Sequence, residues 1–222
     1  DKINQQSSYS QIHRPATLGD GIIELSDSDR NHYAKLYDES VDDYRVIRFI
    51  PASGMATRMF DFLFPLVVED KQDFKVALKT HLNNPKVKSF VEGVQHFPFY
   101  EMVKEQIERV NSHTNNEIDF LQAFIAYVVK QYANKPKAFV PFHKYNKTLK
   151  TAIEEQLTFS TQFSIANDRI THHFTVTPGY ENDFDQHIHD ARLLLEHSHS
   201  CKVDVDYSVQ EASTDSLVMD SE

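Results

Sequence analysis

Residues 51–59 form the segment with the clearest capacity for chemistry, and they read Pro-Ala-Ser-Gly-Met-Ala-Thr-Arg-Met. Small residues, Ser53 and Gly54 among them, allow a phosphate group to approach the backbone closely. Thr57 can add a hydroxyl group, and Arg58 can add a planar guanidinium that binds phosphate in a bidentate manner. A helix expected to begin inside the segment would point its free N–H groups toward the same anion. The segment therefore predicts a phosphate site, with an ordinary tight turn carrying a surface arginine as the alternative.

Other common kinds of catalytic or metal site find little support in the sequence. Residues 51–59 match neither the phosphate loop G-x-x-x-x-G-K-[ST] nor the dinucleotide pattern G-x-G-x-x-G. Ser53 does not lie in the G-x-S-x-G turn of α/β-hydrolases. Asp183, His187 and Asp190 share one face of an expected helix and could hold a metal. We interpret that face as solvated, because no fourth ligand and no cysteine cluster accompanies it.

The strand that must position residues 51–59 lies directly before them. Residues 44–50 contain a short apolar run, which Pro51 and Gly54 close. Such a run is typical of a strand buried on both faces, so we expect this strand in the interior of a sheet. Ligands of open α/β sheets bind at the carboxyl ends of the strands, which is where residues 51–59 would lie.

A long helical region is expected after this segment. Apolar residues recur there at helical spacing, and proline residues divide the region into separate helices. We expect a helical insertion over about residues 60–132, then a loop over residues 134–145 and another helix over residues 148–163.

The last third of the chain predicts a βαβ unit. Residues 169–177 and 201–209 have the alternation of strands, and the residues between them have helical spacing. Together with the first strand, they predict an α/β fold with a mostly parallel open sheet and flanking helices. Residues 1–43 would form an N-terminal extension with a surface helix over residues 27–43, and residues 44–222 would form the α/β domain.

The composition limits the class of partner. The 222 residues carry a net charge of −10 and have a pI near 5.6, which argues against an electropositive surface for nucleic acid or anionic membranes. The single cysteine, Cys201, excludes an intramolecular disulfide, and the start of the chain has no apolar signal region. No apolar run approaches the roughly 20 residues of a membrane span. We therefore expect a cytoplasmic protein that binds neither nucleic acid nor membranes.

Residues 51–59 resemble the L-x-G-G-x-G-T-R-[LM] signature of sugar-nucleotide pyrophosphorylases. Gly54, Thr57, Arg58 and Met59 match the signature, whereas Ser53 and Ala56 replace two of its glycines. The resemblance implies the nucleotide-diphospho-sugar transferase fold. It also implies a nucleotide or nucleotide-sugar and a sugar phosphate as partners, with Mg²⁺ as the cofactor.

Residues 136–142 resemble a second segment of the same enzymes, P-K-[GP]-L-x-P. The lysine of that segment faces the phosphates, so the resemblance implies this role for Lys137, with Lys144 as a nearby substitute. In those enzymes a glutamine after a strand contacts the base and acidic groups further on hold magnesium. The resemblance therefore implies that Gln210 binds the base and that Asp215 binds the metal. The alternatives are a lysine in a proline-rich surface loop and a polar strand end.

Across nearly its whole length, the chain is identified as a member of an uncharacterised bacterial family, domain of unknown function 4301. The stretches that carry this resemblance include residues 14–22, 51–59, 140–144 and 173–178. Members of the family continue into a glycine-rich R-P-G-G-H-G stretch that this sequence lacks. The resemblance therefore implies an N-terminal fragment, which we expect to be inactive by itself as a pyrophosphorylase.

The leading hypothesis is a nucleotidyltransferase-like domain that joins a sugar phosphate to the α-phosphorus of a nucleoside triphosphate. Ser53, Gly54 and Arg58 would hold the leaving phosphates, and Lys137 would neutralise the α-phosphate. One alternative is a nucleotide-sugar or phosphate-binding module without catalysis. Another is a helical interaction protein built on a degenerate transferase fold.

Overall fold

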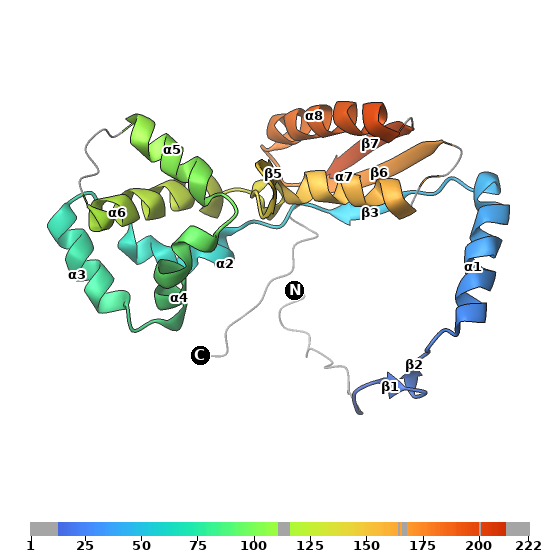
Figure 1. Ribbon diagram of the computed structural model, residues 1–222, viewed down its shortest axis with the longest axis horizontal. Coiled ribbons are helices and arrows are strands. Elements are labelled where there is room, and N and C mark those ends of the chain that lie inside the picture. The colour runs from blue at the N-terminus through green and yellow to red at the C-terminus, as the bar shows by residue number, and fades with distance from the viewer. Residues whose placement is uncertain (1–12, 111–115, 164, 166–167, 200, 212–222) are drawn as a thin grey trace. The chain divides into compact units, whose positions relative to one another are not determined.

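The computed structural model describes residues 13–110, 116–163, 165, 168–199 and 201–211 (Figure 1). The chain divides into two compact units, Asp1–Arg45 and Val46–Glu222. Within the described residues, no helix is long and apolar enough to cross a membrane.

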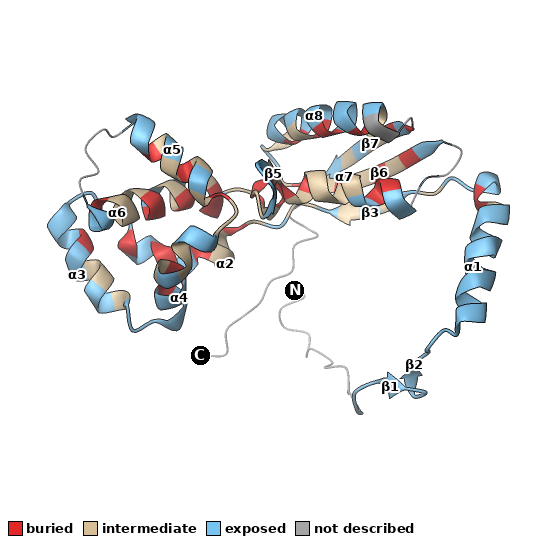
Figure 2. Cartoon of the chain, in the orientation of Figure 1, coloured by how far each residue is buried: buried red, intermediate tan, exposed pale blue. Residues whose placement is uncertain are grey.

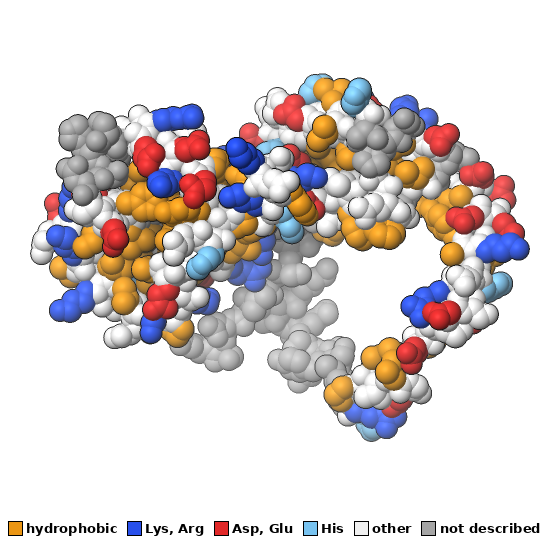
Figure 3. Space-filling model, viewed as in Figure 1, with side chains coloured by type: hydrophobic (Ala, Val, Ile, Leu, Met, Phe, Trp, Pro, Cys, Tyr) orange, Lys and Arg blue, Asp and Glu red, His pale blue; other side chains and the backbone are white. Residues whose placement is uncertain are grey.

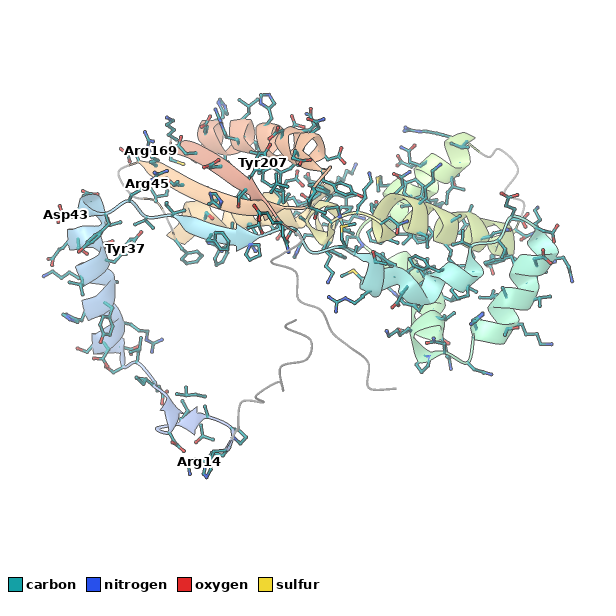
Figure 4. The ribbon with its side chains drawn as sticks, turned by 180° about the vertical axis from the view of Figure 1, so that it is seen from behind. Arg14, Tyr37, Asp43, Arg45, Arg169 and Tyr207 are labelled. Atoms are coloured by element: carbon teal, nitrogen blue, oxygen red, sulfur yellow. The ribbon has the colours of Figure 1, made fainter. Side chains whose placement is uncertain are left out.

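The described part of the first unit contains two short strands, one helix and one 3₁₀ turn. Its elements are β1 (Thr17–Leu18), β2 (Gly21–Ile22), α1 (Asp27–Ser40) and the 3₁₀ turn η2 (Val41–Asp43). Ser26 caps α1, because its hydroxyl oxygen accepts a hydrogen bond from the Asp29 N–H at 3.1 Å while the Asp29 carboxylate accepts one from the Ser26 N–H. No residue of α1 is buried, and Tyr37 is seen on its surface in Figure 4. The expected surface helix is therefore present, and a 3₁₀ turn replaces its last three residues.

The second unit contains a three-stranded sheet in the order β3–β6–β7. Its elements are β3 (Arg48–Pro51), β6 (Arg169–Val176) and β7 (Lys202–Val209), with the helices α7 (Ala152–Phe163) and α8 (Glu181–His199). Both strand pairs are parallel, and Phe174 of β6 lies between Ile50 and Tyr207. Figure 4 shows Arg169 at the amino end of this sheet, where it pairs with Asp204 at 2.6 Å. The expected α/β class with a mostly parallel sheet is confirmed.

Among the described residues, helices pack against one face of the central strand, β6. Its buried residues alternate along the strand and are Ile170, His172, Phe174 and Val176, as the sequence pattern predicts. Apolar side chains of α7 and α8 pack with those of β6 in one hydrophobic cluster. This single covered face fixes the register of the sheet.

The expected interior position of the strand before Pro51 is wrong for the part of the chain that the structure describes. β3 lies at an edge of the sheet, beside β6. Phe49 is 60% exposed and Ile47 is 47% exposed, so the apolar run does not reflect burial on both faces. The ring of Phe49 stacks on the ring of His173 in β6, with 5.8 Å between the ring centroids. Residues 216–219, which could form a further strand, lie outside the described residues.

Helices between β3 and the next strand enclose a second hydrophobic cluster (Figure 2). They are α2 (Thr57–Phe60), η3 (Asp61–Leu66), α3 (Lys71–His81), α4 (Pro85–Gly93), η4 (Val94–His96), α5 (Tyr100–Val110), α6 (Glu117–Val128) and the π-helix η5 (Val129–Ala133). Phe74, Phe99 and Phe124 are fully buried in this cluster, and the Phe99 and Phe124 rings lie 6.3 Å apart. These helices occupy the place of the expected helical insertion.

The region after these helices differs from the expected loop and helix. It contains η6 (Lys137–Phe139) and an antiparallel hairpin of β4 (His143–Tyr145) and β5 (Thr148–Lys150). Helix α7 begins only at Ala152, because Thr151 and Glu154 form a capping box. The T-x-x-E pattern of this box is a signal in the sequence that could have placed the start of the helix.

Candidate functional site

Residues 51–59 are attached to the carboxyl end of β6. The Ala52 N–H donates to the Thr175 carbonyl oxygen at 3.0 Å, and the Thr177 hydroxyl donates to the Ser53 carbonyl oxygen at 2.6 Å. Both contacts lie where the parallel strands end, which is the usual place for a ligand in an open α/β sheet. Thr177 lies outside residues 51–59, and the sequence analysis did not single it out as a site residue.

Ser53 and Gln210 meet at the ends of the three strands. The Ser53 hydroxyl donates a hydrogen bond to Gln210 Oε1, and the Gln210 N–H donates to the Val176 carbonyl oxygen at 2.9 Å. Gln210 directly follows β7, so its side chain reaches back across the end of β6 to residues 51–59. The structure therefore brings together two of the residues that the sequence singled out.

The lysine-containing segment is joined to the same loop by two backbone hydrogen bonds. The Ala56 N–H donates to the Lys135 carbonyl oxygen, and the Lys137 N–H donates to the Gly54 carbonyl oxygen, both at 2.9 Å. An antiparallel bridge between Met55 and Pro136 lies between these bonds. Two segments that are far apart in the sequence are thereby held side by side, as in a short piece of sheet.

Gly54 and Lys137 line one cavity of about 230 Å³. Its other walls come from the carboxyl end of β3, from Phe142, from the first turns of α7 and from Phe174. Most of this lining is apolar, and Lys137 is the one cation among the lining residues. A phosphate or other anion in the cavity would meet the half-buried Lys137 and the exposed backbone of Gly54.

Arg58, Thr57 and Lys144 do not line this cavity. Arg58 and Thr57 lie in α2, whose helix lasts for only four residues and begins without a side-chain cap at Ala56. A single turn carries little of the dipole expected at this point. Lys144 lies in the β4–β5 hairpin, around which Figure 3 shows Lys and Arg side chains at the surface. The structure therefore places Lys137 at the cavity, but not Arg58 or Lys144.

The described residues do not form a recognisable Mg²⁺ site. They contain no group of three or more His, Cys, Asp or Glu side chains that could hold a metal ion. Asp215, which the resemblance implies as a ligand, lies outside the described residues. His187 stacks on Phe139 at 5.0 Å instead of completing a metal site with Asp183. We assign no step of the chemistry to a metal.

A polar network that includes the cavity-lining Gln156 was not expected from the sequence. Arg48 donates a hydrogen bond to Gln156 Oε1 at 3.0 Å, and Gln156 lines the cavity. His172 is fully buried, and its Nε2 lies 2.7 Å from the Ser160 hydroxyl oxygen. The Ser160 hydroxyl already donates to the Gln156 carbonyl oxygen, so the His172 Nε2–H is the donor in that contact.

We expect His172 to make the protein less stable in acid. Burial, and then the nearby Arg48, lower the pKa of His172 from 6.5 to about 4. His172 therefore binds a proton more readily in the unfolded chain than in the folded chain. Stability should fall as pH decreases from about 6.5 to 4. In urea unfolding, the free energy of unfolding should fall by about 2–3 kcal/mol between pH 7 and pH 4.5. The His172→Phe variant should lack this fall. The same loss in both proteins would contradict this assignment.

Comparison with known proteins identifies a family without an assigned activity. The family model described as Domain of unknown function (DUF4301) matches residues 1–222. No curated protein and no solved structure gives a significant match. The geometry of the chain itself must therefore support any functional conclusion.

Proposed function

We propose that this chain, which belongs to the family of domains of unknown function DUF4301, binds the phosphate groups of a nucleotide or nucleotide-sugar beside residues 51–59. The observation that carries the proposal is the placement of Gly54 and Lys137 on one cavity at the carboxyl ends of parallel strands. The backbone bond between these two residues fixes their separation without help from a ligand. Such a preformed arrangement lowers the cost of ordering a binding site.

Each residue of the site has a role that follows from its chemistry. Gly54 exposes backbone to an approaching phosphate, and the Lys137 ammonium neutralises its charge. Ser53 holds the Gln210 side chain beside the loop, where its amide can contact a nucleotide base. With the net charge of the chain at −10, an anionic ligand depends on such a local cation.

Nucleotidyl transfer is the reaction that this placement would serve. An oxygen of a sugar phosphate would form a bond to the α-phosphorus of a nucleoside triphosphate, and the bond from that phosphorus to the bridging oxygen would break. Pyrophosphate would leave with the electron pair of that bond. Lys137 would offset the charge that develops on the α-phosphate, and the loop would align the reactants.

A binding module without catalysis is the second candidate. The cavity lining is mostly apolar and offers one cation, while Arg58 and Lys144 lie outside it. In-line transfer from a triphosphate spreads negative charge over several oxygens, which one lysine neutralises only in part. An assay for pyrophosphate release with nucleoside triphosphates and sugar 1-phosphates separates the two candidates, because a module would bind without turnover.

Gly54→Ala tests the site without disturbing the fold. A Cβ added at Gly54 meets no atom within 4 Å, and Gly54 does not have a left-handed φ. We therefore expect the free energy of unfolding to change by less than about 0.5 kcal/mol. Calorimetry with a panel of nucleoside triphosphates and nucleotide-sugars should show at least a roughly tenfold loss of affinity, because the methyl group occupies the path of the phosphate.

Gly93→Ala is the matched control for this experiment. Gly93 ends α4, it does not line the cavity, and its added Cβ also meets no atom within 4 Å. Stability and affinity should both remain close to those of the parent protein. Equal affinity for the ligand in the Gly54→Ala variant, or no binding of any phosphate compound by the parent, would contradict the proposal.

A further inference from the structure

A second cavity, of about 150 Å³, lies beside residues 135–139. Its lining combines polar and aromatic side chains: Tyr127, Gln131, Tyr132, Lys135, Phe139, Asp183 and His187. None of these residues belongs to the cavity that Gly54 and Lys137 line. The two cavities are therefore separate sites that share one short segment of chain.

The elements around this second cavity hold its walls in defined positions. Tyr132 and Gln131 lie in the π-helix η5, a rare conformation that is frequent at functional sites. Asp183 lies in the first turn of α8, which Tyr180 precedes. The Tyr180 hydroxyl donates to the Asn134 carbonyl oxygen at 2.6 Å and so ties the start of α8 to the end of η5.

The Tyr132 hydroxyl is a donor on this cavity without an acceptor among the described residues. Tyr132 is only 8% exposed, and its hydroxyl makes no hydrogen bond to any described residue. Burial, together with Tyr127, raises the pKa of Tyr132, so the hydroxyl keeps its proton. A donor on a cavity wall that has no protein partner can donate its hydrogen bond to water or to a ligand.

Opposite charges at this cavity are not paired with each other. Lys135 is half-buried and Asp183 is exposed at the rim, and neither side chain forms an ion pair or hydrogen bond with any described residue. An unpaired cation and anion on one small cavity can each find a partner on the same ligand, provided that this ligand carries both charges. A simple anion would satisfy Lys135 and meet repulsion from Asp183.

We propose that this cavity binds a free α-amino acid. Its carboxylate would accept hydrogen bonds from Lys135 and from the Tyr132 hydroxyl, and its ammonium group would contact Asp183. At about 150 Å³, the cavity is below the roughly 300–1,000 Å³ of sites for drug-sized molecules, and this volume fits a ligand of amino-acid size. Phe139, on which His187 stacks, gives the ligand side chain an aromatic wall.

The test is calorimetry of the whole chain with each of the twenty standard amino acids. We expect at least one to bind, and we expect Lys135→Met and Tyr132→Phe to weaken its binding at least tenfold. Lys130→Met is the matched control, because Lys130 lies in the same π-helix, is exposed and does not line the cavity. Its affinity should equal that of the parent protein.

The 2-hydroxy acid that corresponds to the bound amino acid separates a zwitterion site from a simple anion site. It lacks the ammonium group, so its affinity should be at least tenfold lower, and Asp183→Asn should remove this difference. Equal affinity for the two compounds, or no binding of any amino acid, would overturn the proposal. Lys137→Met should leave amino-acid binding unchanged, so a failure of the proposed nucleotide site would not be mistaken for a failure here.

Discussion

Replacement of Phe174 by alanine is expected to lower the free energy of unfolding by about 3–5 kcal/mol. Phe174 is fully buried at the centre of β6, and its ring packs at 5.2 Å against Phe184 of α8. Its removal takes away the contact that joins the central strand to a helix and leaves a void beside the cavity that it already lines. The surrounding backbone is held by strands on both sides, so it cannot collapse freely into that void.

Phe49→Ala is the control for this prediction, because it removes the same side chain from the uncovered face of the sheet. Phe49 is largely exposed and its ring contact is with His173, so we expect a loss below about 1 kcal/mol. Urea unfolding of the two variants under the same conditions measures the difference. Equal losses of unfolding free energy in the two variants would contradict the assignment of the helices to one face of the sheet.

The alternation in β6 could be predicted because burial there follows local chemistry. Every second residue from Ile170 to Val176 is buried, and a period of two is how a strand with one covered face appears in a sequence. The helical spacing between the two strands likewise predicted α8, and the strand expected over residues 201–209 agrees closely with β7. These elements were predictable because the spacing of apolar residues in each of them reflects one covered face.

The position of β3 could not be predicted in this way. Its apolar run is compatible with two covered faces, and nothing within the run distinguishes Ile50, which packs in the core, from the exposed Phe49. An edge position depends on which strands pair, which is a long-range property. The β4–β5 hairpin was missed for a different reason: its turn uses Asn146 at a φ of 55° without a glycine beside it.

The candidate site was predictable in part. Two short motifs pointed to Gly54 and Lys137, and the backbone bonds between their segments place both on one cavity. The same motifs pointed to Arg58, which α2 carries away from the cavity lining. The second cavity gave no signal in the sequence, because its residues come from η5 and α8 and meet only through the fold.

Lys137→Met is expected to have the largest effect on binding of a nucleotide or nucleotide-sugar. Methionine keeps most of the length and apolar stem of lysine but removes the ammonium group, so the bond from the Lys137 N–H to Gly54 should persist. A hydrogen bond to a charged partner contributes about 1.5–3 kcal/mol, which corresponds to a loss of affinity of roughly 10- to 150-fold. Calorimetry at low salt measures this loss directly.

Lys144→Met is the matched control for Lys137→Met, and the pair decides between the two lysines that the sequence offered. Lys144 is exposed in β4 and does not line the cavity, so its contribution should be limited to long-range attraction that salt screens. We expect less than about a threefold loss at low salt and none at physiological ionic strength, where the loss from Lys137→Met should remain. A larger effect of Lys144→Met than of Lys137→Met would place the phosphates over the hairpin, and it would remove the cavity of Gly54 and Lys137 from the proposed function.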